Sequence, residues 1–243
     1  MRLLAALALG LVCAAAAEGA GTADVAASAA RTTAAGTARF TLSVSASYSG
    51  SGVRTREHGT IAFRRRRAHL YKLVPSEPVP QEQIVDGPLV YTNANVTAAL
   101  SDPSVRPWTR VDTRRLPASR RGIGELDHVR ALAYLARGLV GARTLGETPE
   151  LVHLRGRVEP KRVLAGVPAA ERAAIAAVLH ADYTDAAFPA EVWLDRKGRV
   201  RRVLVSYRTA KGTRITISGS LWSFGTHVDV TPPPAREVEN VTP

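Results

Sequence analysis

The chain has 243 residues, of which 45% are hydrophobic, so it is long enough to bury one sizeable core or two small ones. It carries a formal net charge of +12 and one cysteine, Cys13, which excludes an intrachain disulfide and a cysteine-based zinc site. The 22% of charged residues and the ordinary glycine and proline content exclude a wholly disordered or collagen-like chain.

The first residues have the pattern of a secretory signal peptide. One arginine precedes the apolar run Leu3–Cys13, and four alanines follow it. We therefore expect a signal peptide over residues 1–17, cleaved after Ala17 or, as second choice, after Ala20. The apolar run is shorter than the roughly 20 residues that a membrane span needs. The sequence thus predicts an exported protein, located in the periplasm or cell envelope or secreted.

Cys13 raises the question of a lipid anchor. A lipoprotein signal places its cysteine after small residues, whereas Val12 precedes Cys13 here. The interpretation of Cys13 as one more residue of the apolar run is therefore favoured over lipid anchoring.

The excess of basic residues is almost entirely arginine. Arginine supplies 29 of the 33 basic residues, and the chain is also rich in alanine, as a G+C-rich coding sequence produces. The densest clusters are Arg64–Arg67, Arg114–Arg121 and Arg199–Arg202. Aromatic residues are not interleaved with them, so nucleic acid is not an expected partner. These clusters predict a solvated face or peripheral contact with an anionic membrane surface.

The N-terminal half begins with an alanine-rich helix predicted over Ala23–Thr33 and ending near Gly36. From Arg39 to Tyr48, apolar side chains alternate with serine and threonine, which predicts a half-buried antiparallel strand. An Asp86-Gly87 turn indicates a short hairpin. The further strands predicted in this half are Val53–Phe63, Ala68–Val74, Ile84–Val85, Leu89–Tyr91 and Trp108–Val111.

The C-terminal half holds two predicted helices. The first, Leu126–Val140, has a broad apolar stripe and is closed by Gly138 or Gly141. The second, Pro168–His180, has proline in its first turn. Strands are predicted at Leu151–Val158, Val192–Leu194, Val200–Tyr207 and Arg214–Trp222, and residues 232–243 are expected to form an extended, loosely held tail.

This order gives eight to ten strands in meander order, interrupted by two or three helices, without βαβ alternation. A parallel doubly wound sheet is therefore not expected. The predicted fold class is α+β, mainly β, with a curved antiparallel half-barrel sheet whose concave face is covered by the helices.

Three stretches resemble a known family. They are the segment from Pro189 to Val203, the residues from Phe224 to Pro233, and the strand Ala38–Leu42 after its helix. Asp86–Tyr91 in the middle of the sheet is similar too. Together they look like the LolA-like superfamily, particularly the LppX/LprAFG envelope lipoproteins, and the resemblance covers nearly all of the mature chain, which we expect to form one domain over residues 18–231.

The resemblance implies a half-barrel whose helices enclose an apolar cavity, and members that carry lipid moieties, lipoprotein acyl chains or glycolipids. It therefore predicts a non-enzymatic protein that binds a lipid or glycolipid. The expected cavity residues are Phe40, Leu42, Val44, Ile61, Phe63, Leu89, Leu126, Val129, Leu132 and Leu135. The alternative is that these residues fill an ordinary core. Members of the group are usually lipid-anchored through a cysteine, and the poor match at Cys13 departs from that pattern.

Residue patterns for catalysis or metal binding are absent from the sequence. No two of its six histidines have H-x-H or H-x-x-x-H spacing, so neither a metal site nor a cofactor is expected. Gly122-Ile123-Gly124 lacks the third glycine of a dinucleotide site. The alternative function is a regulator-type sensor that binds a protein partner. A large open cavity favours the carrier, whereas a filled core with an exposed apolar patch favours the interaction module. The sequence does not indicate an oligomeric state.

Overall fold

The structure is a computed structural model that describes residues 16–48, 51–73, 79–116, 125–182, 187–208 and 212–242. Within the helices, the side chains of residues 16–24, 125–127, 170, 177–178 and 180–182 are outside this description. The predicted signal peptide lies almost wholly outside the described residues, as do Cys13 and Gly122–Gly124, so the interpretations given to them stay predictions.

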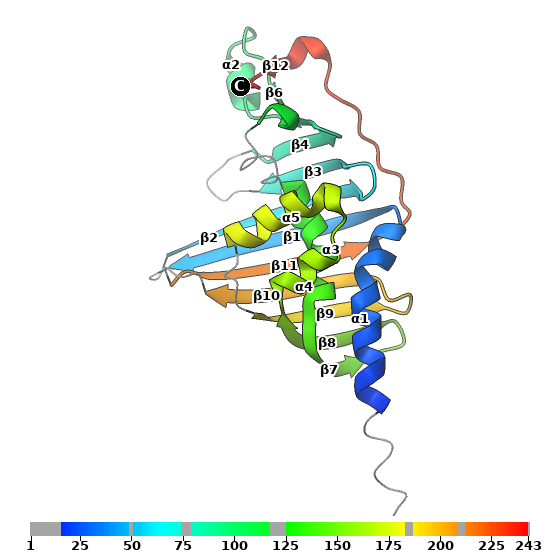
Figure 1. Cartoon of the computed structure of the whole chain (residues 1–243). Helices are drawn as coiled ribbons and strands as arrows, with labels where there is room; N and C mark the ends of the chain where they lie inside the picture. Colours follow the sequence, from blue (N-terminus) through cyan, green and yellow to red (C-terminus); the bar gives the residue numbers. More distant parts are fainter. Residues whose placement is uncertain are drawn as a thin grey trace, which may run out of the picture.

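One large sheet dominates the molecule (Figure 1). Its twelve strands lie in the order β12-β6-β5-β4-β3-β2-β1-β11-β10-β9-β8-β7. Every neighbouring pair is antiparallel except β12 and β6, which are parallel. The strands are β1 (Thr37–Tyr48), β2 (Ser51–Ala62), β3 (Arg67–Leu73), β4 (Gln81–Asp86), β5 (Leu89–Thr92), β6 (Trp108–Asp112), β7 (Leu139–Glu147), β8 (Leu151–Val158), β9 (Phe188–Asp195), β10 (Val200–Arg208), β11 (Arg214–Trp222) and β12 (Val238–Asn240).

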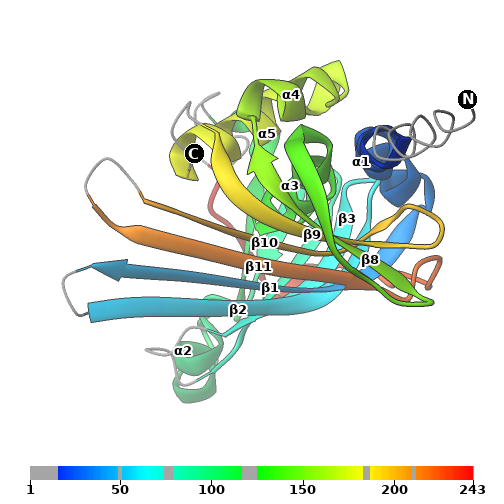
Figure 2. The same cartoon turned by 90° about the horizontal axis from the view of Figure 1, so that it is seen from below.

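Four of the five described α-helices gather on one face of the curved sheet (Figure 2). They are α1 (Ala16–Ala34), α3 (Glu125–Leu135), α4 (Pro160–Ala165) and α5 (Ala169–Asp182). The short α2 (Val96–Ser101) lies at the far end of the sheet, near β4 to β6 (Figure 1). No helix in the described part of the chain is both long and apolar enough to cross a membrane. The predicted fold class, mainly β with a curved sheet and a few helices, is confirmed.

The alternating sequence of β1 sorts its side chains onto two faces. Ala38, Phe40 and Leu42 are buried, whereas Arg39 and Thr41 between them are exposed. We call the face that carries Phe40 and the helices the inner face, and the opposite one the outer face. Cross-strand register extends this sorting to the neighbouring strands, since residues paired across an antiparallel sheet point to the same side.

The main core lies between the inner face and the helices. Leu132 of α3 rests directly on Gly219 of β11, where an added Cβ would lie 2.1 Å from Leu132 Cδ1. Gly219 pairs with Leu42 of β1, so the helix packs over the middle of the sheet. The end of α1 is tied to β10, since Thr32 Oγ1 accepts a hydrogen bond from the Val200 N–H at 2.9 Å.

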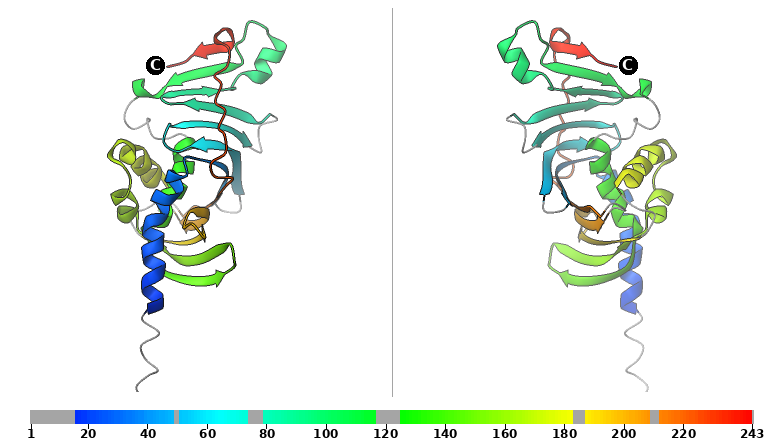
Figure 3. Two further views of the ribbon diagram at one scale, coloured as in Figure 1. Left: turned by 90° about the vertical axis from the view of Figure 1, so that its right-hand side faces the viewer. Right: turned by 90° about the vertical axis from the view of Figure 1, so that its left-hand side faces the viewer.

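A second, smaller core lies on the outer face. Val230 and Val238 of the C-terminal segment pack against Ile84 and Tyr91 of β4 and β5. Arg67 on β3 donates a hydrogen bond to the Val230 carbonyl at 2.9 Å. Figure 3 shows this segment running from the middle of the sheet to its far end. An amphipathic outer surface on β4 and β5 is thus covered by the last residues of the chain.

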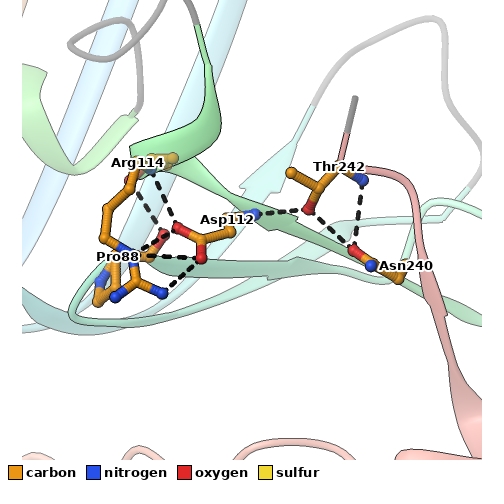
Figure 4. Close-up of polar contacts among 6 residues, drawn as sticks. Pro88, Asp112, Arg114, Asn240 and Thr242 are labelled. Atoms are coloured by element: carbon orange, nitrogen blue, oxygen red, sulfur yellow. Dashed lines mark hydrogen bonds and ion pairs between the residues drawn. The ribbon is translucent and has the colours of Figure 1, made fainter.

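The C-terminal residues are fastened to the sheet edge. β12 pairs with β6, and Thr242 Oγ1 accepts a hydrogen bond from the Asp112 N–H at 2.8 Å while donating to Asn240 Oδ1 at 2.8 Å (Figure 4). Arg114 binds the Asp112 carboxylate from the other side. The expectation of a loosely held tail over residues 232–243 is wrong for this segment, because its hydrogen bonds and its valines join it to the sheet.

The predicted helix Leu126–Val140 is too long. The α-helix ends at Leu135, a 3-10 turn follows over Ala136–Gly138, and β7 begins at Leu139. Gly138 lies where an added Cβ would be 2.4 Å from Val163 Cγ2, so α4 packs against the turn. The elements β7, β12, α2 and α4 were not predicted, so the sheet has more strands than expected.

Candidate functional site

The residues predicted to line a cavity are largely residues of the packed core. Seven of them have exposed fractions of at most 2% and belong to one cluster: Phe40, Leu42, Ile61, Phe63, Val129, Leu132 and Leu135. Val44 is partly buried and packs against that cluster. The side chain of Leu126 lies outside the described residues. The structure therefore brings these eight residues together in one core, which is filled where Leu132 meets Gly219.

Leu89 is separate from the other predicted residues. The turn at Gly87 and Pro88 pairs Leu89 with Asp86 and places Val90 opposite Val85. Leu89 consequently packs with the second core on the outer face, whereas Val90 packs with the main core. The prediction missed by one residue of register, which moves a side chain to the other face of a sheet.

Two pockets lie away from these residues. One, of about 110 Å³, lies between α1 and the β7 to β9 strands and is lined by Arg31, Leu154 and Leu194 among others. The other, of about 150 Å³, lies beside α2 and is lined by Gln81, Asn93 and neighbouring residues. Both are smaller than the roughly 300–1,000 Å³ typical of ligand pockets, so neither holds a whole lipid.

The apolar inner face continues beyond the helices as an open surface. β1, β2, β10 and β11 project as two long hairpins past the helical layer (Figure 2). We define the inner shelf as the inner-face apolar residues on the projecting part of these strands: Val44, Ala46, Tyr48, Val53, Ile215 and Ile217. Tyr48 is 57% exposed and Val53 is 62% exposed. The shelf therefore grades from Ile217, which is buried in the main core, through the half-buried Val44, Ala46 and Ile215 to the exposed Tyr48 and Val53.

The inner shelf exists because the same alternation runs along the whole length of β1. Each of β1 and β2 has 12 residues, which corresponds to about 40 Å of extended chain. Side chains on the inner face change from buried at Phe40 and Leu42 to half-buried at Val44 and Ala46 and exposed at Tyr48. The sequence places apolar side chains at all five positions, including those that the described helices leave uncovered. The sequence contains a signal for this surface that the prediction did not use, namely the length of β1. This strand extends beyond the helices that cover its first half.

Polar residues also lie on the inner face of β2 to β5, next to the buried apolar residues Ile61, Ala68, Leu70 and Val85. Glu57 of β2 pairs with Lys72 of β3, which pairs with Gln81 of β4. In the next row, Gln83 pairs with Thr92 of β5. We call these five residues the polar inner row. Glu57 is only 5% exposed and Gln83 is 8% exposed, so the part of this row that adjoins the core is buried.

The outer face carries a ladder of aromatic and charged side chains. His153 stacks on Trp193 with ring centroids 4.1 Å apart, and Arg202 lies 4.8 Å above the same indole. Glu191 accepts hydrogen bonds from His153 at 2.8 Å and from Arg155 at 2.6 Å. Burial alone raises the pKa of Glu191, but these hydrogen bonds outweigh it, so its pKa lies below the usual 4.5. Cross-strand pairing of this kind stabilises the sheet.

A buried ion pair holds α3 to α5. Arg130 on α3 contacts the carboxylate of Glu171 on α5, and the Tyr134 hydroxyl donates to the same carboxylate at 3.1 Å. Burial, aided by the Glu171 charge, raises the pKa of Tyr134 to about 12. Within the described residues, no group of three or more His, Cys, Asp and Glu side chains is arranged to hold a metal ion.

The fold is similar to that of two solved lipoprotein structures. The lipoprotein LppX of Mycobacterium tuberculosis superposes with a TM-score of 0.53 at 13% identity, covering 87% of this chain and 98% of LppX. The fold is LolA-like. LprF of Mycobacterium bovis gives a TM-score of 0.51 at 13% identity, covering 88% of this chain and 97% of LprF. The LolA-like fold predicted from the sequence is thus confirmed.

Sequence comparison adds no relative. No protein-family profile matches the chain, and no curated protein matches it either. The LolA-like assignment therefore rests on the arrangement of strands and helices.

Proposed function

We propose that this protein binds an amphipathic lipid or glycolipid on the inner face of its LolA-like sheet and carries it through the cell envelope without catalysing a reaction. The observation that carries this proposal is the inner shelf, an apolar surface that runs from the core to solvent. Its similarity in fold to two lipoproteins and its signal-type N-terminus support an exported carrier. Its domain comprises the predicted residues 18–231 and the C-terminal segment fastened to them.

The shelf offers an acyl chain an apolar surface. Removing a methylene group from water contributes about 0.8 kcal/mol. Ten methylenes laid along the shelf thus contribute about 8 kcal/mol before the cost of ordering the ligand. Val44 and Ile215 lie next to the core, so the chain can extend toward the residues under α3 if that helix moves outward. The predicted cavity residues then act as the deeper part of the same binding surface.

The polar inner row gives the ligand an orientation. Glu57, Lys72 and Gln81 lie in register on neighbouring strands, and Glu57 is opposite Leu42 of β1. Carboxylate, ammonium and amide groups together bind hydroxyls and charged groups better than they bind hydrocarbon. We place the headgroup against the half-buried members of this row, Lys72, Gln81 and Thr92, and the acyl chain against the shelf, which favours a lipid with a hydroxylated or zwitterionic head.

Native mass spectrometry of the full chain, expressed and processed in an envelope-bearing host, tests this proposal. A co-purifying lipid in stoichiometric amount is expected, and organic extraction identifies it. The double variant Val44→Glu/Ile215→Glu should lose the lipid because charges replace the centre of the shelf. The matched control Ser45→Glu/Thr216→Glu puts the same charges on the same strands but on the outer face, and should keep it. A lipid-free mass that is unchanged by envelope lipid extract contradicts the proposal.

A packed core beside an exposed apolar patch also supports a second candidate, an interaction module that binds a protein partner through the inner shelf. Exposed apolar patches mark protein interfaces as well as ligand grooves. This candidate predicts that the chain stays lipid-free and that the Val44→Glu/Ile215→Glu variant loses a protein captured from the same host by cross-linking. The mass measurement therefore separates the two candidates.

A further inference from the structure

We propose that the free end of the two projecting hairpins is a docking surface for an anionic lipid bilayer. This surface comprises exposed arginines on the outer face and exposed apolar side chains on the inner face, all at the same end of the sheet. It goes beyond the proposed function because docking requires no bound ligand.

The charge at this end is one-sided. Six arginines lie on the outer face of β10, β11, β1 and β2: Arg39, Arg54, Arg56, Arg202, Arg208 and Arg214. Among the described residues of these four strands the sole carboxylate is Glu57, which points to the inner face and is 5% exposed. The outer face of the hairpins therefore presents positive charge without a compensating acid.

Four of these arginines gather toward the free end. Register places Arg208 beside Arg214, and Arg214 beside Ser47 of β1. Arg54 and Arg56 follow on β2, opposite Ser45 and Ser43. All four arginines are exposed, and none of them forms an ion pair with a described residue. We call Arg54, Arg56, Arg208 and Arg214 the arginine tip.

The arginine tip has N–H donors that are available to bind phosphate. The Arg54 Nε donates to Ser43 Oγ at 3.1 Å, and one Arg208 nitrogen donates to the Gly212 carbonyl at 3.1 Å. Each guanidinium has five N–H donors, so most of them stay available to a ligand. One planar guanidinium can donate two parallel hydrogen bonds to two oxygens of the same phosphate. Serine hydroxyls between the arginines add further donors at the same surface.

Apolar side chains lie on the reverse of the same strand ends. Tyr48 and Val53 belong to the inner shelf and are the most exposed of its members, at 57% and 62%. Tyrosine is enriched at the level of lipid headgroups because its ring is apolar and its hydroxyl is polar. A polyanion such as nucleic acid would need the arginines alone, whereas a bilayer uses both the arginines and this apolar edge. The combination therefore favours a bilayer.

This docking would also orient the proposed carrier. The exposed shelf residues Tyr48 and Val53 lie at the same end of the hairpins as the arginine tip. A protein that docks by this end brings the open end of its apolar face to the membrane. Lipid then moves between bilayer and shelf without crossing a wide layer of water.

Vesicle flotation tests the proposal on the full processed chain. We expect binding to vesicles of phosphatidylglycerol and phosphatidylcholine, weakened by salt, and little binding to phosphatidylcholine alone. Each arginine near an anionic surface strengthens binding about fivefold. The variant with all four residues of the arginine tip changed to serine should therefore bind at least tenfold more weakly. Tyr48→Ser/Val53→Ser should also weaken binding, in contrast to what a purely electrostatic contact predicts.

The matched control removes four exposed arginines elsewhere: Arg64, Arg65, Arg115 and Arg143, each changed to serine. It has the same net charge as the tip variant, so it should keep binding within about threefold. Equal losses in both variants would show attraction by net charge only and would overturn the proposal. Unchanged binding by the tip variant, or equal binding to neutral vesicles, would overturn it as well.

A labelling experiment keeps the proposal testable if the tip variant does not fold. Ser47→Cys and Ser101→Cys each carry an environment-sensitive dye, on the arginine tip side and on α2 respectively. The dye at position 47 should brighten on anionic vesicles, while the dye at position 101 should not. The reverse result, or no change at either position, contradicts docking by this end. Failure here leaves the lipid binding measured by mass spectrometry untouched, so the two proposals fail separately.

Discussion

The contact between Leu132 and Gly219 allows a test of how firmly α3 covers the sheet. Gly219→Ala adds a methyl group 2.1 Å from Leu132 Cδ1 and 2.8 Å from Cδ2. In an unstrained strand, Gly→Ala stabilises a protein by about 0.4–1 kcal/mol through the unfolded state. Overpacking a core costs about 1–3 kcal/mol instead. The structure therefore predicts that Gly219→Ala lowers the free energy of unfolding, so the sign of the effect is diagnostic.

A double-mutant cycle isolates this contact. Leu132→Ala alone should cost about 2–5 kcal/mol because it leaves a cavity under α3. In the double variant, the methyl at position 219 enters that cavity without collision. We therefore expect the double variant to be more stable than the sum of the single effects predicts, by about 1 kcal/mol or more. Urea unfolding followed by far-ultraviolet circular dichroism measures all three free energies.

Gly146→Ala provides the control for this cycle. Gly146 lies on β7, and nothing lies within 4 Å of an added Cβ there. This substitution should be neutral or slightly stabilising. If Gly219→Ala stabilises the protein like the control, or if the cycle is additive within about 0.5 kcal/mol, α3 does not pack on Gly219 as described.

Three further predictions concern polar contacts. The pKa of Tyr134 is raised from 10.0 to about 12, so the folded state holds the phenol proton more tightly than the unfolded state does. The contribution of Tyr134 to the free energy of unfolding should be full below pH 10.0 and should be lost as the pH rises toward about 12. Absorbance at 295 nm measures the titration, and unfolding curves measure the stability. Arg130→Met leaves the Glu171 carboxylate buried without its arginine and should cost about 3–5 kcal/mol in urea unfolding, whereas a loss below about 1 kcal/mol contradicts a buried pair. Thr242→Val removes the hydrogen bond to the Asp112 N–H, so hydrogen exchange at this amide should accelerate, and unchanged protection refutes the fastening of the C-terminus.

The strands were the most predictable part of the fold. Apolar and polar residues alternate from Phe40 to Tyr48, as expected for a strand. The structure has the same alternation because β1 is one uninterrupted strand. The helix predicted to reach Val140 shows where patterns fail. Leu139 fits the apolar stripe of α3 equally well, but the turn at Gly138 packs against Val163 of α4 and sends Leu139 into β7. That outcome depends on a neighbour distant in sequence, which a local pattern does not contain.

The candidate site was predictable in composition but not in shape. The alternation in β1 predicts that Phe40 and Leu42 share one buried face, which the structure confirms. Whether such residues line a space or fill it depends on how closely the helices approach, as Leu132 does at Gly219. The basic and apolar end of the hairpins was missed for a related reason. Arg54 and Arg214 are far apart in sequence and meet only through the pairing of β1 with both β2 and β11.

The order of strands has a consequence for how the chain folds. The sheet consists of two meanders, β1 to β6 and β7 to β11, which meet only where β1 pairs with β11. That junction joins Arg39 to Trp222, so it forms late, because distant contacts carry a large loop-closure entropy. A chain that is synthesised from its N-terminus exposes the unpaired edge of β1 until β11 has been made. An unpaired edge strand promotes aggregation, so holding the nascent chain apart from its copies is a requirement of its biogenesis.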